Sequence, residues 1–287
     1  MRTLADILIL GTIWGAMYCL IAVGFTLIFG VGRIINLVHG SYYMLGAYFA
    51  YTFMSVMKMN IVLSALMAVA ASIVIGLLID RFGVRPFRQR HVYVLILTLS
   101  LAYFIQEVIF VIFGVYGKGV KSFIAGEMTL GNVNISYQKV LTLFSSAALI
   151  VLLWFFINKT KTGKSISAVA QNRDAAVFVG IRPERIFLIT AGISAGLAAA
   201  AGVFIAPIIE AFPTMWVFPL FRAFVIVIIG GLGSIEGAII ASMLLGYSET
   251  AVSLLISPNF SDMVYLVAII LVMAIRPMGL FGKSATA

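Results

Sequence analysis

Charged residues are scarce in this chain, and their scarcity excludes a water-soluble globular protein. Asp, Glu, Lys and Arg make up 10% of the 287 residues, while 63% are hydrophobic and the mean hydropathy is +1.15. Soluble domains average about 25% charged residues. Disorder is also excluded, because it requires low hydrophobicity and high net charge. The composition instead predicts a polytopic membrane protein.

Residues that build metal, redox or catalytic centres are equally rare. The chain has one cysteine, Cys19, and two histidines, which excludes an intrachain disulfide and a cysteine metal site. Paired carboxylates, an H-E-x-x-H motif and a Ser/His constellation are missing, so an enzyme is not expected. A G-x-x-x-x-G-K-[ST] phosphate loop is missing too, since Asn158 and Pro277 stand where the first glycine should precede the two Gly-Lys-Ser triplets. No metal and no cofactor are therefore expected in this chain.

Long apolar runs separate the few charges. A crossing needs about 20 apolar residues, because the hydrocarbon core is about 30 Å thick and a helix rises about 1.5 Å per residue. Charge-free runs of this kind are 7–32, 34–57, 59–79, 140–158 and 186–209. Weaker runs, which carry or adjoin one charge, are 92–113, 216–233, 237–256 and 263–275. We expect an all-α polytopic membrane protein of eight or nine transmembrane helices with broken or re-entrant segments, forming a single domain over 1–287.

The excess of positive charge indicates the topology. Lys and Arg exceed Asp and Glu by 19 to 10, and the basic residues concentrate in the windows 80–91 and 159–185. Short basic loops are typical of the cytoplasmic side, so this clustering argues against nucleic-acid binding. It predicts that 114–139 is an external loop and that the C-terminus, with Lys283, is cytoplasmic. The N-terminus is external if 34–57 crosses fully and cytoplasmic if that run is re-entrant.

Glycine interrupts the apolar runs at two places. The segment Asn36–Gly40, which contains His39, and the segment Gly230–Gly237, which contains Gly233, are both expected to be broken or re-entrant. Small residues permit such breaks and also the close approach of helices. Non-helical backbone survives at membrane depth only beside protein or a wet cavity. These segments are therefore candidates for the wall of a transport pathway, with tight helix packing as the alternative explanation.

Three ionisable residues lie within the runs: Glu107, Arg222 and Glu249. An ionisable group inside a membrane is costly and marks a functional site by default. Either these residues form an ion pair that locks helices together, or they contact the charged ends of a zwitterionic substrate. For His39 a hydrogen bond at a helix end is favoured over a proton relay, because the chain offers no polar relay in series.

The basic loop 159–185 contains a short helical pattern that ends in a glycine. Four side chains are spaced to share one helical face: Val169, Asn172, Ala176 and Val179. Gly180 is expected to end this helix in left-handed backbone, with Pro183 shortly after it. The pattern predicts one short helix held at the cytoplasmic surface.

The same loop carries a first family resemblance. Asp174-Ala175-Ala176-Val-Phe-Val-Gly180, preceded by Arg173, resembles the E-A-A-x-x-x-G loop of bacterial ABC importer permeases. Asp replaces Glu here, and the I-x-L-P tail of that motif is absent. In the family this loop is a coupling helix that docks on the ATPase subunit.

Three further segments extend the resemblance along the chain. The sequence INLVHGSYYMLGAY at 35–48 is similar to the I-N-F-A-H-G…G-A-Y element of branched-chain amino-acid permeases. GGLGSIEGA at 230–238 is similar to their G-G-x-G-S-x-x-G-A element, and RPMGLFGK at 276–283 to their R-P-x-G-L-F-G terminus. These segments, in order and at family length, resemble the shorter, LivH-type permeases of that system.

The resemblance implies a permease subunit of an ATP-driven importer in the bacterial inner membrane. Its implied partners are a second homologous permease, a periplasmic substrate-binding protein and two cytoplasmic ATPase subunits that hold ATP and magnesium. Branched-chain or related amino acids are the implied substrates. The alternatives are another small substrate, such as urea or an amide, and a stand-alone secondary transporter that would couple ions through Glu107 and Glu249.

Overall fold

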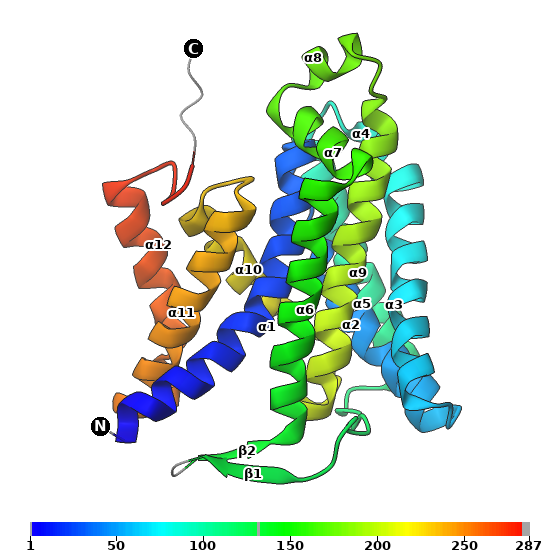
Figure 1. Ribbon diagram of the computed structural model, residues 1–287. Coiled ribbons are helices and arrows are strands. Elements are labelled where there is room, and N and C mark those ends of the chain that lie inside the picture. The colour runs from blue at the N-terminus through cyan, green and yellow to red at the C-terminus, as the bar shows by residue number, and fades with distance from the viewer. Residues whose placement is uncertain (1, 131–132, 283–287) are drawn as a thin grey trace.

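The computed structural model describes residues 2–130 and 133–282, so the predicted position of Lys283 lies outside the described residues. Long helices run through the molecule, short helices cover one end, and a β-hairpin lies at the other end (Figure 1). In the described part, seven helices are long and apolar enough to cross a membrane. The chain therefore has the polytopic, almost entirely helical fold that its composition predicts.

The elements follow one another along the chain with short connections. The helices are α1 (Arg2–Gly32), α2 (His39–Tyr51), the π-helical η1 (Thr52–Val56), α3 (Ile61–Leu78), the π-helical η2 (Ile79–Val84), α4 (Arg85–Phe87), α5 (His91–Phe113), α6 (Tyr137–Lys159), α7 (Lys161–Gln171), α8 (Arg173–Phe178), α9 (Pro183–Ile209), α10 (Val217–Gly230), α11 (Ile235–Leu255), the 3-10 helix η3 (Pro258–Phe260) and α12 (Met263–Ile275). An antiparallel hairpin of β1 (Glu127–Leu130) and β2 (Val133–Ser136) interrupts the helical series. The loop predicted at 114–139 thus contains this hairpin and ends at Ser136, where the Ser136 side chain caps α6.

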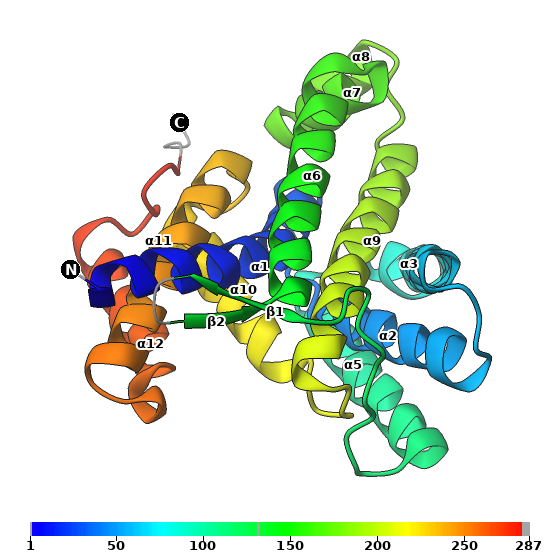
Figure 2. The same ribbon diagram turned by 60° about the horizontal axis from the view of Figure 1, so that its bottom comes forward.

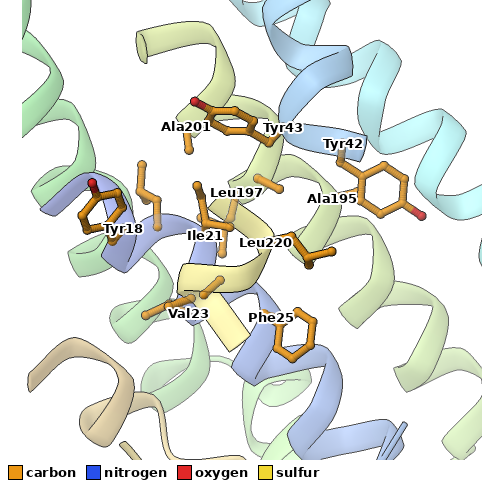
Figure 3. Close-up of a cluster of buried hydrophobic side chains, with 14 of the residues drawn as sticks. Tyr18, Ile21, Val23, Phe25, Tyr42, Tyr43, Ala195, Leu197, Ala201 and Leu220 are labelled. Atoms are coloured by element: carbon orange, nitrogen blue, oxygen red, sulfur yellow. The ribbon is translucent and has the colours of Figure 1, made fainter. Parts of the chain in front are cut away.

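The core is built around α1 and α9. In their most apolar stretches 67% of α1 and 83% of α9 is buried, against 6–33% in the other five spanning helices. Helices α2, α3 and α5 lie on the α9 side, and α10, α11 and α12 lie on the α1 side (Figure 2). Side chains of α1, α2, α9 and α10 meet at the centre (Figure 3). The apolar outer faces of the other helices suit a lipid environment, in which only the polar backbone needs to be shielded.

Helix α10 is too short to cross the membrane alone, since it has 14 residues, or about 20 Å at 1.5 Å per residue, against about 30 Å of hydrocarbon. Helix α2 has 13 residues and continues directly into the 5 residues of η1, so that it is longer than α10 but also starts inside the bundle. Their starting ends meet, because Gly40 of α2 packs against Leu220 and the Trp216 carbonyl at the beginning of α10. Residues 33–38 are not helical and form the break predicted before α2, whereas 231–234 form only the short connection between α10 and α11.

The run 34–57 crosses the molecule, although it is not a continuous helix. A non-helical link, 33–38, enters the bundle, and the half-helix α2 continues toward the hairpin end (Figure 1). Link and half-helix together traverse the molecule, so the run is broken and still reaches the far end. The start of α1 consequently lies at the hairpin end, opposite α7 and α8.

Glycines allow the half-helix α2 to approach α9 closely. A Cβ atom at Gly46 would overlap the backbone of Ala199, and one at Gly202 would overlap the carbonyl of Tyr43. A second close contact joins α1 to α11, where Gly246 lies against Gly15. Close backbone approach through small residues is a main source of helix association in membranes.

We expect Gly46→Ala to destabilise the protein by about 1–3 kcal/mol, because the added methyl group forces two backbones apart in a packed core. The change is read as a lower melting temperature of the detergent-purified protein. Gly119→Ala is the matched control, since a Cβ at Gly119 meets open space and its backbone is not left-handed. Equal melting temperatures for both variants would show that α2 and α9 are not this closely packed.

Candidate functional site

The basic loop forms two helices rather than the single helix predicted. Helix α7 starts where the Thr160 hydroxyl accepts a hydrogen bond from the amide of Gly163 at 3.0 Å. It ends at Asn172, whose backbone is extended and whose Oδ1 accepts a bond from the Ala175 amide at 2.9 Å, so that Asn172 starts α8. Asparagine favours such caps over helix interiors, because its side chain competes for backbone groups.

The break divides the predicted helical face. Val169 and Ala176 are buried, as that face requires, but Asn172 and Val179 are exposed. Gly180 has a φ of +82°, in the left-handed region that favours glycine, and its amide donates to the Val177 carbonyl at 2.9 Å. The predicted glycine stop is therefore confirmed, while the predicted continuous face is wrong.

A carboxylate in the first turn of α9 joins the two basic loops. Glu184 lies 3.2 Å from Arg85 Nε, 2.9 Å from Arg88 Nη1 and 3.4 Å from Arg173 Nη2. Arg85 and Arg88 belong to the first basic loop and Arg173 to the second, so loops about 90 residues apart in the sequence share one anchor. Through Glu184, the start of α8 is thereby linked to α4 and to Arg88, which directly follows α4.

The buried member of this network is Arg88, whose side chain is only 6% exposed. Its Nη2 donates to Asp80 at 2.7 Å, and its guanidinium lies 4.2 Å from the centre of the Phe187 ring. A buried guanidinium needs opposite charge and a face to stack on, and the planar fork of arginine suits both. Asp80 and Phe187 provide them.

Beyond this network, α8 carries an exposed apolar tip at the outermost end of the molecule (Figure 1). Val177, Phe178 and Val179 are 52%, 91% and 75% exposed. The charged residues Arg173 and Asp174 are exposed at the beginning of the same helix, and Ala175 lies beside them. An exposed apolar group rimmed by charge marks an interaction surface. The sequence pattern pointed to the loop but not to these three residues, although a Val-Phe-Val run in a basic loop is the signal that identifies them.

A second polar cluster lies among α1, α10, α11 and α12. Arg222 Nη2 lies 3.0 Å from Glu249 Oε1 and 2.7 Å from Asp262 Oδ1. Tyr18 accepts a hydrogen bond from Arg222 and donates one to Glu249, and the Tyr265 hydroxyl donates to Glu249 Oε2 at 2.7 Å. The ion pair suggested for Arg222 and Glu249 is thus present. Tyr18, Asp262 and Tyr265 were not anticipated, since they come from distant parts of the chain.

Glu107 takes no part in that cluster. It lies exposed on α5, and its Oε1 accepts a hydrogen bond from Gln106 Nε2 at 3.2 Å. Gln106 in turn accepts a bond from the Trp216 indole at 2.8 Å. This polar pair therefore lies next to the junction of the two half-helices, on a helix face that is otherwise apolar.

His39 is fully buried and bonded on both sides. Its Nε2 lies 3.0 Å from the Ile21 carbonyl, and its Nδ1 lies 3.0 Å from the Ser194 hydroxyl. These contacts hold the start of α2 to α1 and α9, which agrees with the hydrogen bond favoured for this residue at a helix end. The neighbouring pathway candidates Asn36 and Gly40 are buried as well.

The glycines of the second break pack tightly. Gly230 lies against the backbone of Gly237, and Gly233, in left-handed backbone, lies against Gly30. The C-terminal segment completes this region, because the amides of Leu280 and Phe281 donate to the carbonyls of Ile229 and Gly230 at 2.7 and 3.1 Å. Within residues 2–130 and 133–282, His, Cys, Asp and Glu side chains form no group of three suited to a metal ion.

Known proteins share both the sequence pattern and the fold. The family profile described as the permease component of the branched-chain amino acid transport system matches residues 7–273. The chain belongs to this permease family. The permease is 30% identical over 293 residues to the high-affinity branched-chain amino acid transport system permease protein BraD of Pseudomonas aeruginosa, covering 96% of this chain and 95% of BraD. It is 28% identical to LivH of Escherichia coli K12, covering 95% of this chain and 94% of LivH.

More distant proteins carry the same architecture. A probable LivH of Methanocaldococcus jannaschii is 25% identical to this permease, over 94% of this chain and 90% of the relative. The solved structure of PsaBC from Streptococcus pneumoniae in complex with Fab includes a chain that superposes with a TM-score of 0.55 at 11% identity, over 96% of this chain and 94% of that one. That likeness concerns the fold alone. The family assignment makes this chain a multi-pass transport permease of the inner membrane.

We expect Arg222→Met to destabilise the permease by about 3–5 kcal/mol, because the change leaves the buried Glu249 carboxylate without its counter-charge. The measurement is thermal unfolding of the detergent-purified protein. The double variant Arg222→Met with Glu249→Met is expected to recover part of the loss, since it removes both charges together. Additive losses in the double variant would contradict a direct pair.

Proposed function

We propose that this permease is the membrane subunit of an ATP-driven importer of branched-chain or related amino acids. Separate cytoplasmic ATPase subunits hydrolyse ATP with magnesium, and a periplasmic binding protein delivers the substrate. The family assignment and the names of the relatives support this proposal. The structural observation that carries it is the exposed apolar tip of α8, held by charge at the outermost end of the molecule.

The geometry of α8 suits the transmission of force from an ATPase. Its tip is free to enter a groove on a partner, while Arg173 ties its base to Glu184 of α9. Glu184 also holds Arg88, and Arg88 holds Asp80 at the end of α3. A displacement of the tip therefore acts on α3 and α9 together, and α9 is the most buried of the seven long helices.

The proposed topology places α7, α8 and the C-terminus in the cytoplasm and the hairpin outside. The N-terminus is then external, at the hairpin end. In this topology the half-helices α2 and α10 would each contribute a crossing beside the seven long helices, which would give nine. The basic residues of both loops lie at the cytoplasmic end in this arrangement, as the positive-inside rule requires.

A second permease is proposed to cover the face of α5. Glu107 is exposed on that face, and a carboxylate facing lipid is costly, so such groups face protein or a wet cavity. The surrounding side chains Phe104, Val108 and Val111 are exposed and apolar. A substrate pathway between two permeases would be lined by Glu107 and by the half-helix junction beside it.

The stand-alone transporter is less well supported. Ion coupling would need a carboxylate free to release and bind cations, and Glu107 and Glu249 are the two candidates. Glu249 is engaged by Arg222, Tyr18 and Tyr265. These contacts indicate that Glu249 holds helices together and is not free to bind a cation. Glu107 alone does not provide a series of groups that could pass an ion across the membrane. Urea or an amide as the substrate is likewise less well supported, because the relatives are named for branched-chain amino acids.

We expect Phe178→Ser to weaken binding of the ATPase subunit by about 30-fold or more, because an aromatic anchor at the centre of an interface contributes about 2 kcal/mol or more. The measurement is retention of the ATPase during purification, together with ATP-driven uptake in vesicles. Tyr116→Ser removes an equally exposed aromatic ring from the opposite end and should leave ATPase retention unchanged. Normal retention with Phe178→Ser would contradict the coupling role of α8.

We expect a photo-crosslinking residue at Val111, which is 82% exposed on α5, to capture a second permease chain identified by mass spectrometry. The reason is that the carboxylate one turn earlier, Glu107, needs a protein neighbour. The same residue placed at Leu152, exposed on α6, should label only lipid. Capture from Leu152 alone would assign the permease interface to α6 instead.

A further inference from the structure

A cavity of about 370 Å³ lies at the cytoplasmic end, between α7 and the start of α9. Its polar lining consists of the cations Lys161, Arg182 and Arg185 and the hydroxyls of Thr162 and Ser165. The volume falls within the range of about 300–1,000 Å³ typical of small-molecule sites. The coupling role proposed for α8 makes no use of this cavity or of its three cations.

The three cations are not neutralised by neighbouring acids. Among the described residues, no carboxylate lies within ion-pair distance of Lys161, Arg182 or Arg185. Glu184, which stands between the two arginines in the sequence, is turned to the other side of α9, where it binds Arg85, Arg88 and Arg173. The cavity is therefore strongly positive, and its ligand must carry negative charge.

The cavity lies at the level where the membrane surface is expected. Helix α7 covers the ends of α6 and α9 (Figure 1). It buries Ile166 and Val169 against the bundle and exposes Lys161 and Lys164, as an interfacial helix does. Toward the bilayer the lining continues as Ile186 and Ile189 of α9. A ligand in this position meets cations at one end and apolar side chains at the other.

We propose that this cavity binds the phosphodiester headgroup of an anionic phospholipid of the cytoplasmic leaflet, such as phosphatidylglycerol. Lys161, Arg182 and Arg185 bind the phosphate oxygens, with Arg able to do so through two parallel N–H bonds. Thr162 adds a hydroxyl donor, and the acyl chains pass Ile186 and Ile189. Basic pockets between transmembrane helices on the cytoplasmic side are suited to such headgroups. Helices α7 and α9 come directly before and after the coupling helix α8 in the chain. A lipid bound between α7 and α9 would therefore hold the two helices that flank α8.

The test uses the full-length permease in detergent and measures by native mass spectrometry how strongly it retains phosphatidylglycerol relative to phosphatidylcholine. A variant with Arg182→Gln and Arg185→Gln is expected to lose about 25-fold of this preference, since each surface cation contributes about fivefold to the binding of an anionic lipid. Ser165→Leu narrows the cavity and removes one hydroxyl without changing its charge, and it is expected to reduce the preference as well. Melting temperatures near that of the unsubstituted protein show that both variants are folded.

The control variant carries Lys159→Gln and Lys164→Gln, which remove two charges from the same end of the molecule but outside the cavity lining. It should keep the preference for phosphatidylglycerol. An equal loss in this control would overturn the proposal in favour of general surface charge, and an undiminished preference in the Arg182/Arg185 variant would overturn it outright. A third arm adds inorganic phosphate: complete displacement of the lipid at millimolar phosphate would identify a free phosphate as the ligand instead.

Discussion

The structure depends on one constraint: backbone that leaves a helix inside the bilayer must find hydrogen-bond partners without water. The link 33–38, between α1 and α2, is such a segment, and a distant part of the chain supplies a partner for it. The Leu37 amide in this link donates to the Thr98 hydroxyl of α5 at 3.2 Å. The end of α10 is also held by a distant segment, because its last carbonyls accept bonds from the amides of Leu280 and Phe281.

The same constraint explains the distribution of small residues and charge. Half-helices that meet in the core stay in place only if neighbouring helices pack closely against them. Gly46 of α2 and Gly202 of α9 permit this close packing between α2 and α9. Charges inside the bundle must be paired, and Arg222 is surrounded by Glu249, Asp262 and two tyrosines. At the cytoplasmic end water is available, and there the charges serve connection and recognition instead. Glu184 binds the arginines that hold α8, while the cations of α7 and α9 around the cavity remain open to a ligand.

Particular residues show how far sequence reasoning reaches. Gly180 could be recognised as a helix stop because the requirement for left-handed backbone is local. The breaks near Asn36 and Gly231 could be recognised for a similar reason, since glycine and polar residues stand out in an apolar run. Asn172 was misread as part of a helical face, because its capping bond to Ala175 competes with the helical pattern and no periodicity reveals which of them prevails.

Composition and nearest neighbours along the chain suffice to establish the membrane class, the basic loops and the interruption of the apolar runs by glycine. Which of the rare charges meet depends instead on how the helices pack. Arg222 was recognisable as a costly residue, but Tyr18, Asp262 and Tyr265 become its partners only because α1, α10 and α12 converge. Likewise the two basic loops looked alike in sequence, and the fold united them through Glu184. Pairing inside a membrane depends on which helices are adjacent, and adjacency follows from packing over the whole chain.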